Sequence, residues 1–152
     1  MTPIAIPDDV RAQIYAHARA TFPAECCGYL VGPRDGRVVH AAIACRNAQV
    51  DGEHPTHPER GADTGFVIAG AELLVFARAF DGDAPPRIVY HSHTNGRAYF
   101  SSVDREVAAN AYPVQHLVVG VTAERVTEAA LYAWSDAERE LIELARWSVE
   151  TP

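Results

Sequence analysis

The sequence contains little cysteine, and its three cysteines exclude two kinds of site. Cys26 and Cys27 are adjacent and Cys45 is the third, so the number is odd. This pattern provides neither a disulfide framework nor a CxxC metal-binding motif. Because free thiols persist in reducing compartments, we expect the protein to be cytoplasmic.

Long hydrophobic runs and an excess of positive charge are also missing. No apolar run approaches the ~18 residues needed to span a bilayer. The N-terminal stretch "MTPIAIPDDV" has neither the basic nor the apolar region of a signal peptide. The formal net charge of −7 argues against broad binding to nucleic acid or to an anionic membrane. We therefore expect neither as a partner.

What the chain does contain suits one folded domain. Its 152 residues are enough to bury a hydrophobic core and too few for two comfortable domains. A content of 48% hydrophobic and 22% charged residues is typical of a globular protein. We therefore expect residues 1–152 to form a single domain.

Helical and strand patterns alternate along the chain. In the first predicted helix, which Asp8 or Asp9 can cap, Val10 and Ile14 share a face at helical spacing. The predicted helices are residues 7–23, 68–82 and 101–111, and the predicted strands are residues 26–32, 37–45, 87–93, 116–122 and 125–134. The first two strands flank "PRDG" and predict a hairpin, whereas residues 136–150 fit either a helix or a strand. The interleaving predicts an α/β or α+β fold.

Polar groups concentrate in the stretch "YHSHTNGRAYFSSVD", which runs from Tyr90 to Asp104. Side chains alternate between the two faces of a strand, so His91 and His93 project to the same side and Ser92 points to the other. Asp104 begins the next predicted helix, and a strand–loop–helix return could bring its carboxylate back to the histidines. Imidazole and carboxylate are zinc ligands. The three side chains would then form an open zinc site.

Hydrolysis at such a site needs two further groups. A water molecule activated by a metal must lose a proton to a nearby base. Glu25, between the first predicted helix and the first predicted strand, is the best-placed candidate. A carbonyl under attack also needs a hydrogen-bond donor for the developing oxyanion, and the hydroxyl of Ser101 can supply it.

Each of these signals is weak when taken alone. A His-x-His pair on a strand is more often a pair of hydrogen-bonded or exposed histidines than a metal site. Ser101-x-x-Asp104 also matches an acidic form of the capping box, which needs no catalysis. Glu25 could be a surface carboxylate after a helix. The combination is what is specific.

The combination resembles the motif of the JAMM (MPN+) zinc metallopeptidases, which is Glu, then His-x-His, seven residues, Ser, two residues and Asp. The resemblance covers residues 7–134, and residues 94–100 are the seven between the second histidine and the serine. It implies these roles: zinc binding by His91, His93 and Asp104, general-base catalysis by Glu25, and stabilisation of the tetrahedral intermediate by Ser101.

Within this family the chain looks most like the small bacterial members that act on ubiquitin-like sulfur-carrier proteins. Thr94 and Ala98-Tyr99 resemble the actinobacterial member that releases cysteine from the C-terminus of such a carrier. Many other members have proline at position 94 and again at position 100, where this chain has Thr94 and Phe100. The first difference supports the sulfur-carrier subgroup, and the second would reshape the cleft. The candidate substrate contacts are Thr94 and Tyr99.

The resemblance implies an MPN-type fold, which is a mixed, curved β-sheet flanked by helices in a cytidine-deaminase-like arrangement, with Zn²⁺ at one edge. It implies a substrate tail that ends in Gly-Gly and binds in extended form beside a sheet edge. The implied reaction is zinc-dependent hydrolysis of the amide bond after the terminal glycine, releasing cysteine or a short extension. Members of the family often pair, which allows a homodimer.

Two alternatives stay open. A deubiquitinase-like isopeptidase would remove ubiquitin-like modifiers from lysines with the same chemistry. A metal-free MPN scaffold would only bind partners. Such scaffolds typically lose the metal ligands, whereas this chain keeps all five motif positions.

Overall fold

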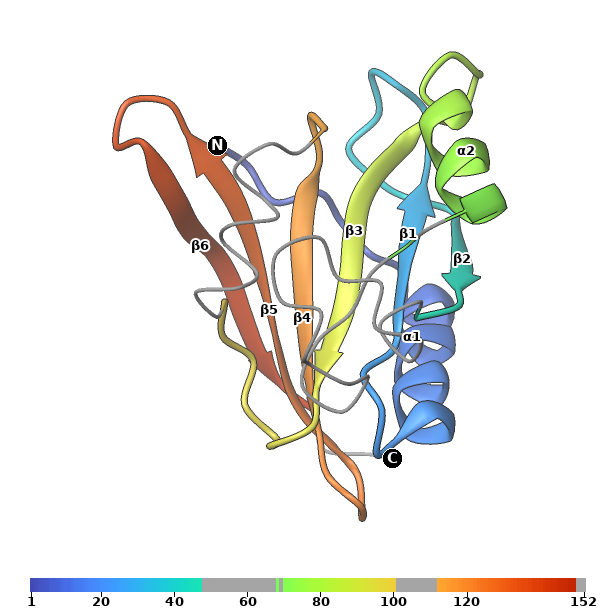
Figure 1. Ribbon diagram of the computed structural model, residues 1–152. Helices are drawn as coiled ribbons and strands as arrows, with labels where there is room; N and C mark the ends of the chain where they lie inside the picture. Colours follow the sequence, from blue (N-terminus) through green and yellow to red (C-terminus); the bar gives the residue numbers. More distant parts are fainter. Residues whose placement is uncertain (48–67, 69, 101–111, 150–152) are drawn as a thin grey trace.

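One mixed β-sheet organises the chain (Figure 1). The computed structural model describes residues 1–47, 68, 70–100 and 112–149. The elements are α1 (Asp8–Thr21), β1 (Cys27–Val31), β2 (Ala41–Cys45), α2 (Gly70–Ala79), β3 (Pro86–His93), β4 (Gln115–Val121), β5 (Val126–Ser135) and β6 (Glu140–Ser148). The mixture of helices with this sheet confirms the predicted α+β class.

The strand order of the six-stranded sheet is β2-β1-β3-β4-β5-β6. β3 and β4 are parallel, and the other neighbouring pairs are antiparallel. The antiparallel pairing of β1 with β2 confirms the predicted hairpin. Parallel neighbours need a crossover, so residues 94–114 carry the chain from the end of β3 back to the start of β4.

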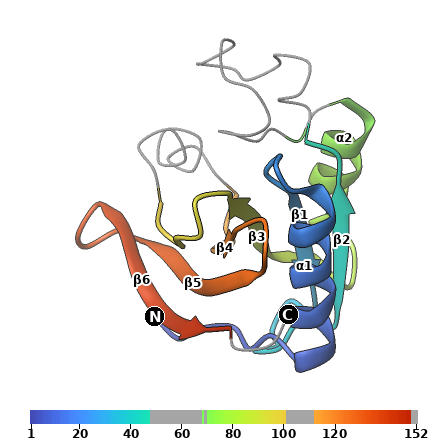
Figure 2. The ribbon, with the colours of Figure 1, turned by 90° about the horizontal axis from the view of Figure 1, so that it is seen from below.

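The helix α1 covers one face of the sheet because its apolar residues recur every four positions. Val10, Ile14 and Ala18 are buried, and they belong to the same core cluster as Leu30 of β1 and Ile88 of β3. Figure 2 shows α1 running alongside β1 and β2, with the sheet curving away toward β6. This face is the main hydrophobic core.

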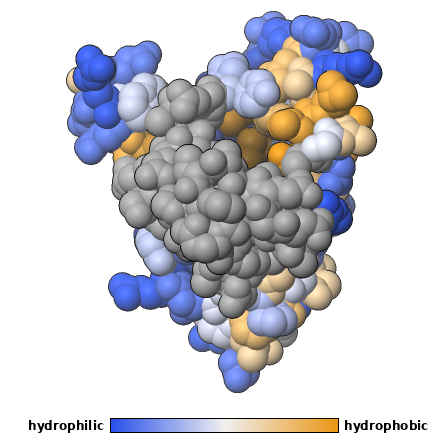
Figure 3. Space-filling model, viewed as in Figure 1, coloured by the Kyte–Doolittle hydropathy of each residue, from blue (hydrophilic) through white to orange (hydrophobic). Residues whose placement is uncertain are grey.

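The opposite face of the sheet packs against α2. Tyr29 of β1 points to this side, since side chains alternate along a strand, and its ring meets that of Phe76 at 4.9 Å between centroids. Phe76 is the buried residue of α2, while Leu74 and Val75 are more than half exposed. Apolar side chains accordingly gather on the surface over α2, at the upper right of Figure 3.

Two details of the predicted elements are decided by the structure. The backbone of Pro7, not of either aspartate, occupies the N-cap of α1, and no side chain caps the helix there. Asp8 and Asp9 lie in the first turn, where carboxylates interact favourably with the helix dipole, so the predicted side-chain cap is wrong. The ambiguous residues 136–150 contain a strand, β6. The predicted helix over residues 101–111 lies outside the described residues.

Among the helices that the structure describes, none is both long and apolar enough to cross a membrane.

Candidate metal centre

The pairing of β1 with β3 brings Glu25 to the two histidines. The strands are antiparallel, and Cys27 at the start of β1 lies opposite His91 near the end of β3. Glu25 precedes β1 by two positions, so it lies just outside the sheet, beside the carboxyl end of β3. His93 is the last residue of β3. Residues far apart in sequence therefore meet at one end of the sheet.

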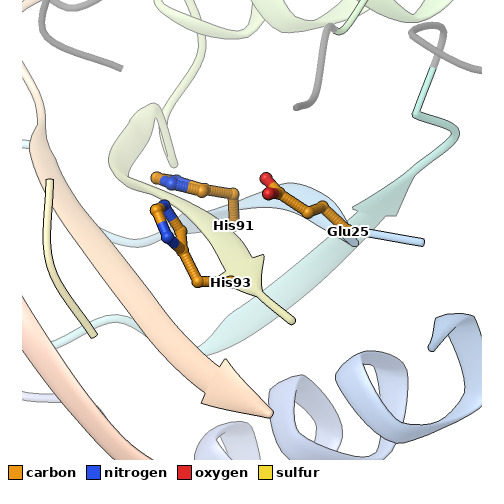
Figure 4. Close-up of side chains that lie close together, drawn as sticks. All are labelled: Glu25, His91 and His93. Carbon is orange, nitrogen blue, oxygen red and sulfur yellow. The ribbon is translucent and has the colours of Figure 1, made fainter. Parts of the chain in front are cut away.

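The side chains of Glu25, His91 and His93 form a compact polar group. One carboxylate oxygen and one ring nitrogen from each histidine all lie within 4.8 Å of one another. The two imidazole rings are 5.1 Å apart between centroids, and the three residues are 5%, 2% and 6% exposed. Figure 4 shows the rings of His91 and His93 side by side on β3, with the Glu25 carboxylate, from the segment that precedes β1, turned toward them. Three such donors, buried together, are close enough to share one small cation.

The main chain on either side of this group is fixed by hydrogen bonds. The Ser92 hydroxyl accepts from the Cys26 N–H at 2.8 Å, and the Ser92 N–H donates to the Cys26 carbonyl at 3.1 Å. The Asn47 side-chain amide donates to the Glu25 carbonyl at 2.9 Å. Ser92 thus turns away from the histidines, as predicted from strand alternation, and ties the segment that carries Glu25 to β3.

Two aromatic rings from the segment after β3 lie against the histidines. Tyr99 meets His93 edge-on, with 4.5 Å between ring centroids. Phe100 meets His91 edge-on at 5.8 Å and is buried in a small apolar cluster with residues of β4, β5 and β6. These contacts restrict how the imidazoles can turn.

The candidate substrate contacts differ in exposure. Tyr99 is 42% exposed while it touches His93, so it offers a surface directly beside the candidate metal centre. Thr94 follows β3 and is only partly exposed. Their predicted role in substrate binding stays a prediction.

Ser101 and Asp104 lie outside the described residues, so their predicted roles also stay predictions. The described part of the chain supplies two imidazole nitrogens and a carboxylate oxygen, which is the donor chemistry that zinc takes in proteins. No calcium-like cage of several oxygens is formed by these three residues. The donor set fits zinc, with Glu25 either as a ligand or as the base beside it.

The buried thiols near this centre are poorly suited to nucleophilic chemistry. Cys26 and Cys27 are fully buried, and all three cysteines are free. Burial raises the pKa of Cys26 to about 12 and that of Cys45 to about 12. Burial also raises the pKa of Cys27. Since the thiolate is the reactive form, these residues serve packing.

Sequence reasoning missed the side chains that hold the segment after β3. Glu128 of β5 accepts a hydrogen bond from the Ala98 N–H at 2.8 Å, and Arg146 of β6 donates to the Ala98 carbonyl at 2.8 Å. Neither residue belongs to a motif. The pairing of β5 with β6 places them side by side, and the sequence of residues 136–150 did not distinguish a strand from a helix.

Comparison with known proteins agrees with this arrangement. Residues 7–135 match the family model described as prokaryotic homologs of the JAB domain. The CysO-cysteine peptidases of Mycobacterium bovis and Mycobacterium tuberculosis are each 31% identical to this chain over 121 residues, which is 80% of this chain and 75% of theirs.

Solved structures share the fold. A protein from Desulfitobacterium hafniense superposes with a TM-score of 0.64 at 20% identity, covering 91% of this chain and 87% of its own. A protein from Salinibacter ruber gives a TM-score of 0.61 at 24% identity and covers 94% and 88%. A JAB1/MPN domain protein from Archaeoglobus fulgidus gives 0.52 at 16% identity and covers 95% and 96%. These similarities confirm the expected MPN-type fold.

Proposed function

Because this chain belongs to the family of prokaryotic JAB-domain homologues, we propose that it is a zinc-dependent peptidase of the JAMM type. Its substrate would be a ubiquitin-like sulfur-carrier protein that ends in Gly-Gly. It would hydrolyse the amide bond after the second glycine and release cysteine or a short C-terminal extension. The relative named CysO-cysteine peptidase supports this choice of substrate.

The convergence of Glu25, His91 and His93 is the observation that carries the proposal. A scaffold that only binds partners does not require a carboxylate and two imidazoles buried within 4.8 Å of one another, whereas imidazole nitrogen and carboxylate oxygen are the donors that zinc takes in proteins. A metal centre accounts for all three at once. The burial also excludes bulk water, which strengthens the electrostatic interactions on which hydrolysis depends.

Each motif residue would then have its own role. When bound, zinc supplies a Lewis acid that activates water and polarises the scissile carbonyl. His91 and His93 hold the metal, with Asp104 as the third ligand. Glu25 accepts a proton from the attacking water and returns it to the leaving amine. The hydroxyl of Ser101 donates a hydrogen bond to the oxyanion. The tasks of Ser101 and Asp104 rest on the motif.

A Gly-Gly tail suits an active site at the end of a sheet. Glycines have no side chain, so an extended tail can approach a buried metal closely. Affinity would come from main-chain hydrogen bonds along the tail, and Thr94 and Tyr99 would contact the residues next to the cleaved bond. The protein would act in the cytoplasm as one domain of residues 1–152, alone or as a homodimer.

Intact-mass analysis of carrier proteins tests this function. The zinc-loaded protein is incubated with Gly-Gly-ended ubiquitin-like carriers that bear a C-terminal cysteine, a longer peptide or a lysine-linked conjugate. We expect loss of the cysteine or of the short extension, and no further trimming past Gly-Gly. The chain contains no lysine, so no lysine-linked conjugate can form on the enzyme and every such mass belongs to the substrate.

Two controls make the result specific. A chelator and the isosteric Glu25→Gln substitution should each abolish cleavage, since one removes the metal and the other the base. Cleavage confined to the lysine-linked conjugate would replace the proposal with an isopeptidase. No cleavage of any carrier by protein shown to hold zinc would contradict a peptidase of this specificity.

A further inference from the structure

Residues 94–100 join the two histidines to Ser101, the predicted donor to the oxyanion. Side chains hold this segment at Ala98. Ala98 is fully buried, so both polar groups of its backbone need partners. Its N–H donates to Oε2 of Glu128 at 2.8 Å. Its carbonyl accepts from Nη2 of Arg146 at 2.8 Å and from the Tyr132 hydroxyl at 3.2 Å. We call these three side chains the Ala98 clamp.

The clamp is itself connected. Nη1 of Arg146 donates to the same Glu128 oxygen at 2.9 Å, and Nη2 donates to the Tyr132 hydroxyl at 3.2 Å. Glu143 accepts from Nε and Nη2 of Arg146 at 3.0 and 2.8 Å. These bonds, chiefly the one to Glu143, raise the pKa of Arg146. Carboxylates on either side therefore hold the guanidinium in one orientation, in which Nη2 reaches the Ala98 carbonyl and Nη1 reaches Glu128.

A second contact fixes the segment upstream. Thr127 of β5 donates a hydrogen bond to the Gly96 carbonyl, and Gly96 has a positive φ of 79° that favours glycine. Beneath it, a Cβ on Gly120 of β4 would lie 2.6 Å from the Gly96 carbonyl carbon. The absence of a side chain at Gly120, which lies opposite His93 in the sheet, lets the segment rest on the strand.

The two residues that follow Ala98 make the contacts between this segment and the candidate metal centre. Tyr99 directly follows Ala98 and lies edge-on to His93. Phe100 lies edge-on to His91 and also against Tyr132, at 5.3 Å between centroids. A shift of Ala98 would move both rings, and with them the orientation of both imidazoles. None of the clamp side chains belongs to the compact group of possible metal donors.

We propose that Glu128 and Arg146 are positioning residues of the metal centre, which fix the 94–100 segment through the backbone of Ala98 and thereby orient His91 and His93. The inference rests on the proposed zinc function. It assigns a role in the site to β5 and β6, which contribute no residue to the motif. Groups that hydrogen-bond directly to metal ligands typically change metal affinity or activity by roughly 10- to 100-fold when they are removed; Glu128 and Arg146 act one contact further away, so we expect the lower end of this range.

Four variants of the full chain separate positioning from simple stability. Arg146→Lys keeps the charge and the aliphatic stem but loses the fork that reaches Ala98 and Glu128 together. Glu128→Gln keeps an acceptor for the Ala98 N–H and loses the charge. Glu143→Gln is the matched control, because Glu143 binds Arg146 and makes no hydrogen bond to Ala98. Arg78→Lys, on the exposed side of α2, controls for the Arg-to-Lys change itself.

The main readout is the visible absorption spectrum of the Co²⁺-loaded protein, which reports ligand geometry around the metal. Zinc affinity by chelator competition is measured in parallel, and urea unfolding confirms that each variant is folded. For Arg146→Lys we expect an altered Co²⁺ spectrum and a roughly 10-fold weaker zinc affinity. For Glu128→Gln we expect a smaller change in the same direction. Arg78→Lys should match the wild type, and Glu143→Gln, which keeps an acceptor for Arg146 and makes no hydrogen bond to Ala98, should change the spectrum and the zinc affinity less than Glu128→Gln does.

A carrier-cleavage assay at saturating zinc completes the test. We expect Arg146→Lys to lower kcat with little change in KM, because a positioning residue acts on the geometry of the metal ligands and not on the binding of the substrate tail. Wild-type spectra and zinc affinity in folded Arg146→Lys and Glu128→Gln would overturn the positioning role while leaving the zinc function intact. A wild-type protein that binds neither Co²⁺ nor Zn²⁺ would instead overturn both proposals together.

Discussion

At the scale of single residues, a half-buried histidine outside the candidate metal centre, His17, has a shifted pKa. Nδ1 of His17 on α1 lies 2.7 Å from the hydroxyl of Tyr90 on β3. Tyr90 is 1% exposed, and burial raises its pKa, so its hydroxyl stays protonated. Burial lowers the pKa of His17 below its usual 6.5. The imidazole is therefore favoured in its neutral form in the folded protein.

This pKa shift predicts how stability depends on pH. Because the folded pKa of His17 is below the unfolded one, the unfolded chain takes up the proton first as the pH falls. The contribution of neutral His17 is present above about pH 6.5 and is lost as the pH drops through its lowered folded pKa. The free energy of unfolding should therefore fall more steeply below pH 6.5 in the wild type than in His17→Gln.

Urea unfolding at several pH values between 8 and 5 measures the difference between these two proteins. The comparison with His17→Gln cancels the contributions of all other titratable groups. A constant difference across the whole range would contradict the assignment.

At the scale of elements, the site depends on a close approach between β4 and the 94–100 segment. A Cβ on Gly120 would lie 2.6 Å from the Gly96 carbonyl oxygen and 2.8 Å from the Arg97 nitrogen. These are backbone atoms and cannot move aside as a side-chain tip can. Gly120→Ala should destabilise the protein by about 1–3 kcal/mol, the usual cost of overpacking. It should also displace the segment from β4.

Urea unfolding gives the change in stability, and hydrogen exchange at the Ala98 amide reports the displacement. Faster exchange is expected because the bond to Glu128 is broken. Gly82→Ala is a suitable control, since a Cβ there meets only the Ala79 carbonyl oxygen at 3.5 Å. Equal stability of the two variants would show that the segment yields easily.

The elements themselves were largely predictable where one periodicity dominates. Val10, Ile14 and Ala18 recur at helical spacing and lie on the buried face of α1. His91 and His93 alternate with Ser92 as a strand requires, and the structure brings both histidines to Glu25. The segment of β6 was not predictable, because its composition favours a helix while pairing with β5 decides the outcome. Local propensity is overruled there by the sheet.

The side chains that hold the 94–100 segment could not be predicted for a related reason. The convergence of Glu25, His91 and His93 could be predicted from the sequence, because chemistry restricts which residue types bind zinc or move protons. Ordinary residue types such as Glu128 and Arg146 carry no such restriction. Their importance follows only from the backbone atoms that they reach, and those contacts depend on strand register.

At the scale of the whole molecule, a metal bound at the candidate centre between β3 and the segment before β1 would link metal binding to folding. A ligand that binds only the folded state adds stability in proportion to the logarithm of its concentration over its Kd. Zinc-loaded protein should therefore unfold at a higher temperature than protein treated with a chelator. His91→Ala should remove most of this difference, whereas Glu25→Gln should keep it if Glu25 is the base and not a ligand.

Thermal unfolding followed by circular dichroism, with and without excess chelator, measures these shifts. A midpoint that is independent of zinc in the wild type would contradict a metal centre. A Glu25→Gln midpoint that no longer responds to zinc would instead make Glu25 a ligand.

The antiparallel pairing of β1 with β3 also has a kinetic consequence. Glu25 and His91 belong to distant parts of the sequence, and they meet only when Cys27 comes into register with His91. The loop that must close for this contact is long, and such nonlocal pairings form slowly. During refolding, a metal-sensitive dye should register zinc uptake no earlier than the step that joins these strands if Glu25 is a ligand, whereas uptake can precede that step if His91, His93 and Asp104 alone bind the metal. The order of zinc uptake and strand pairing would therefore report whether Glu25 takes part in binding the metal.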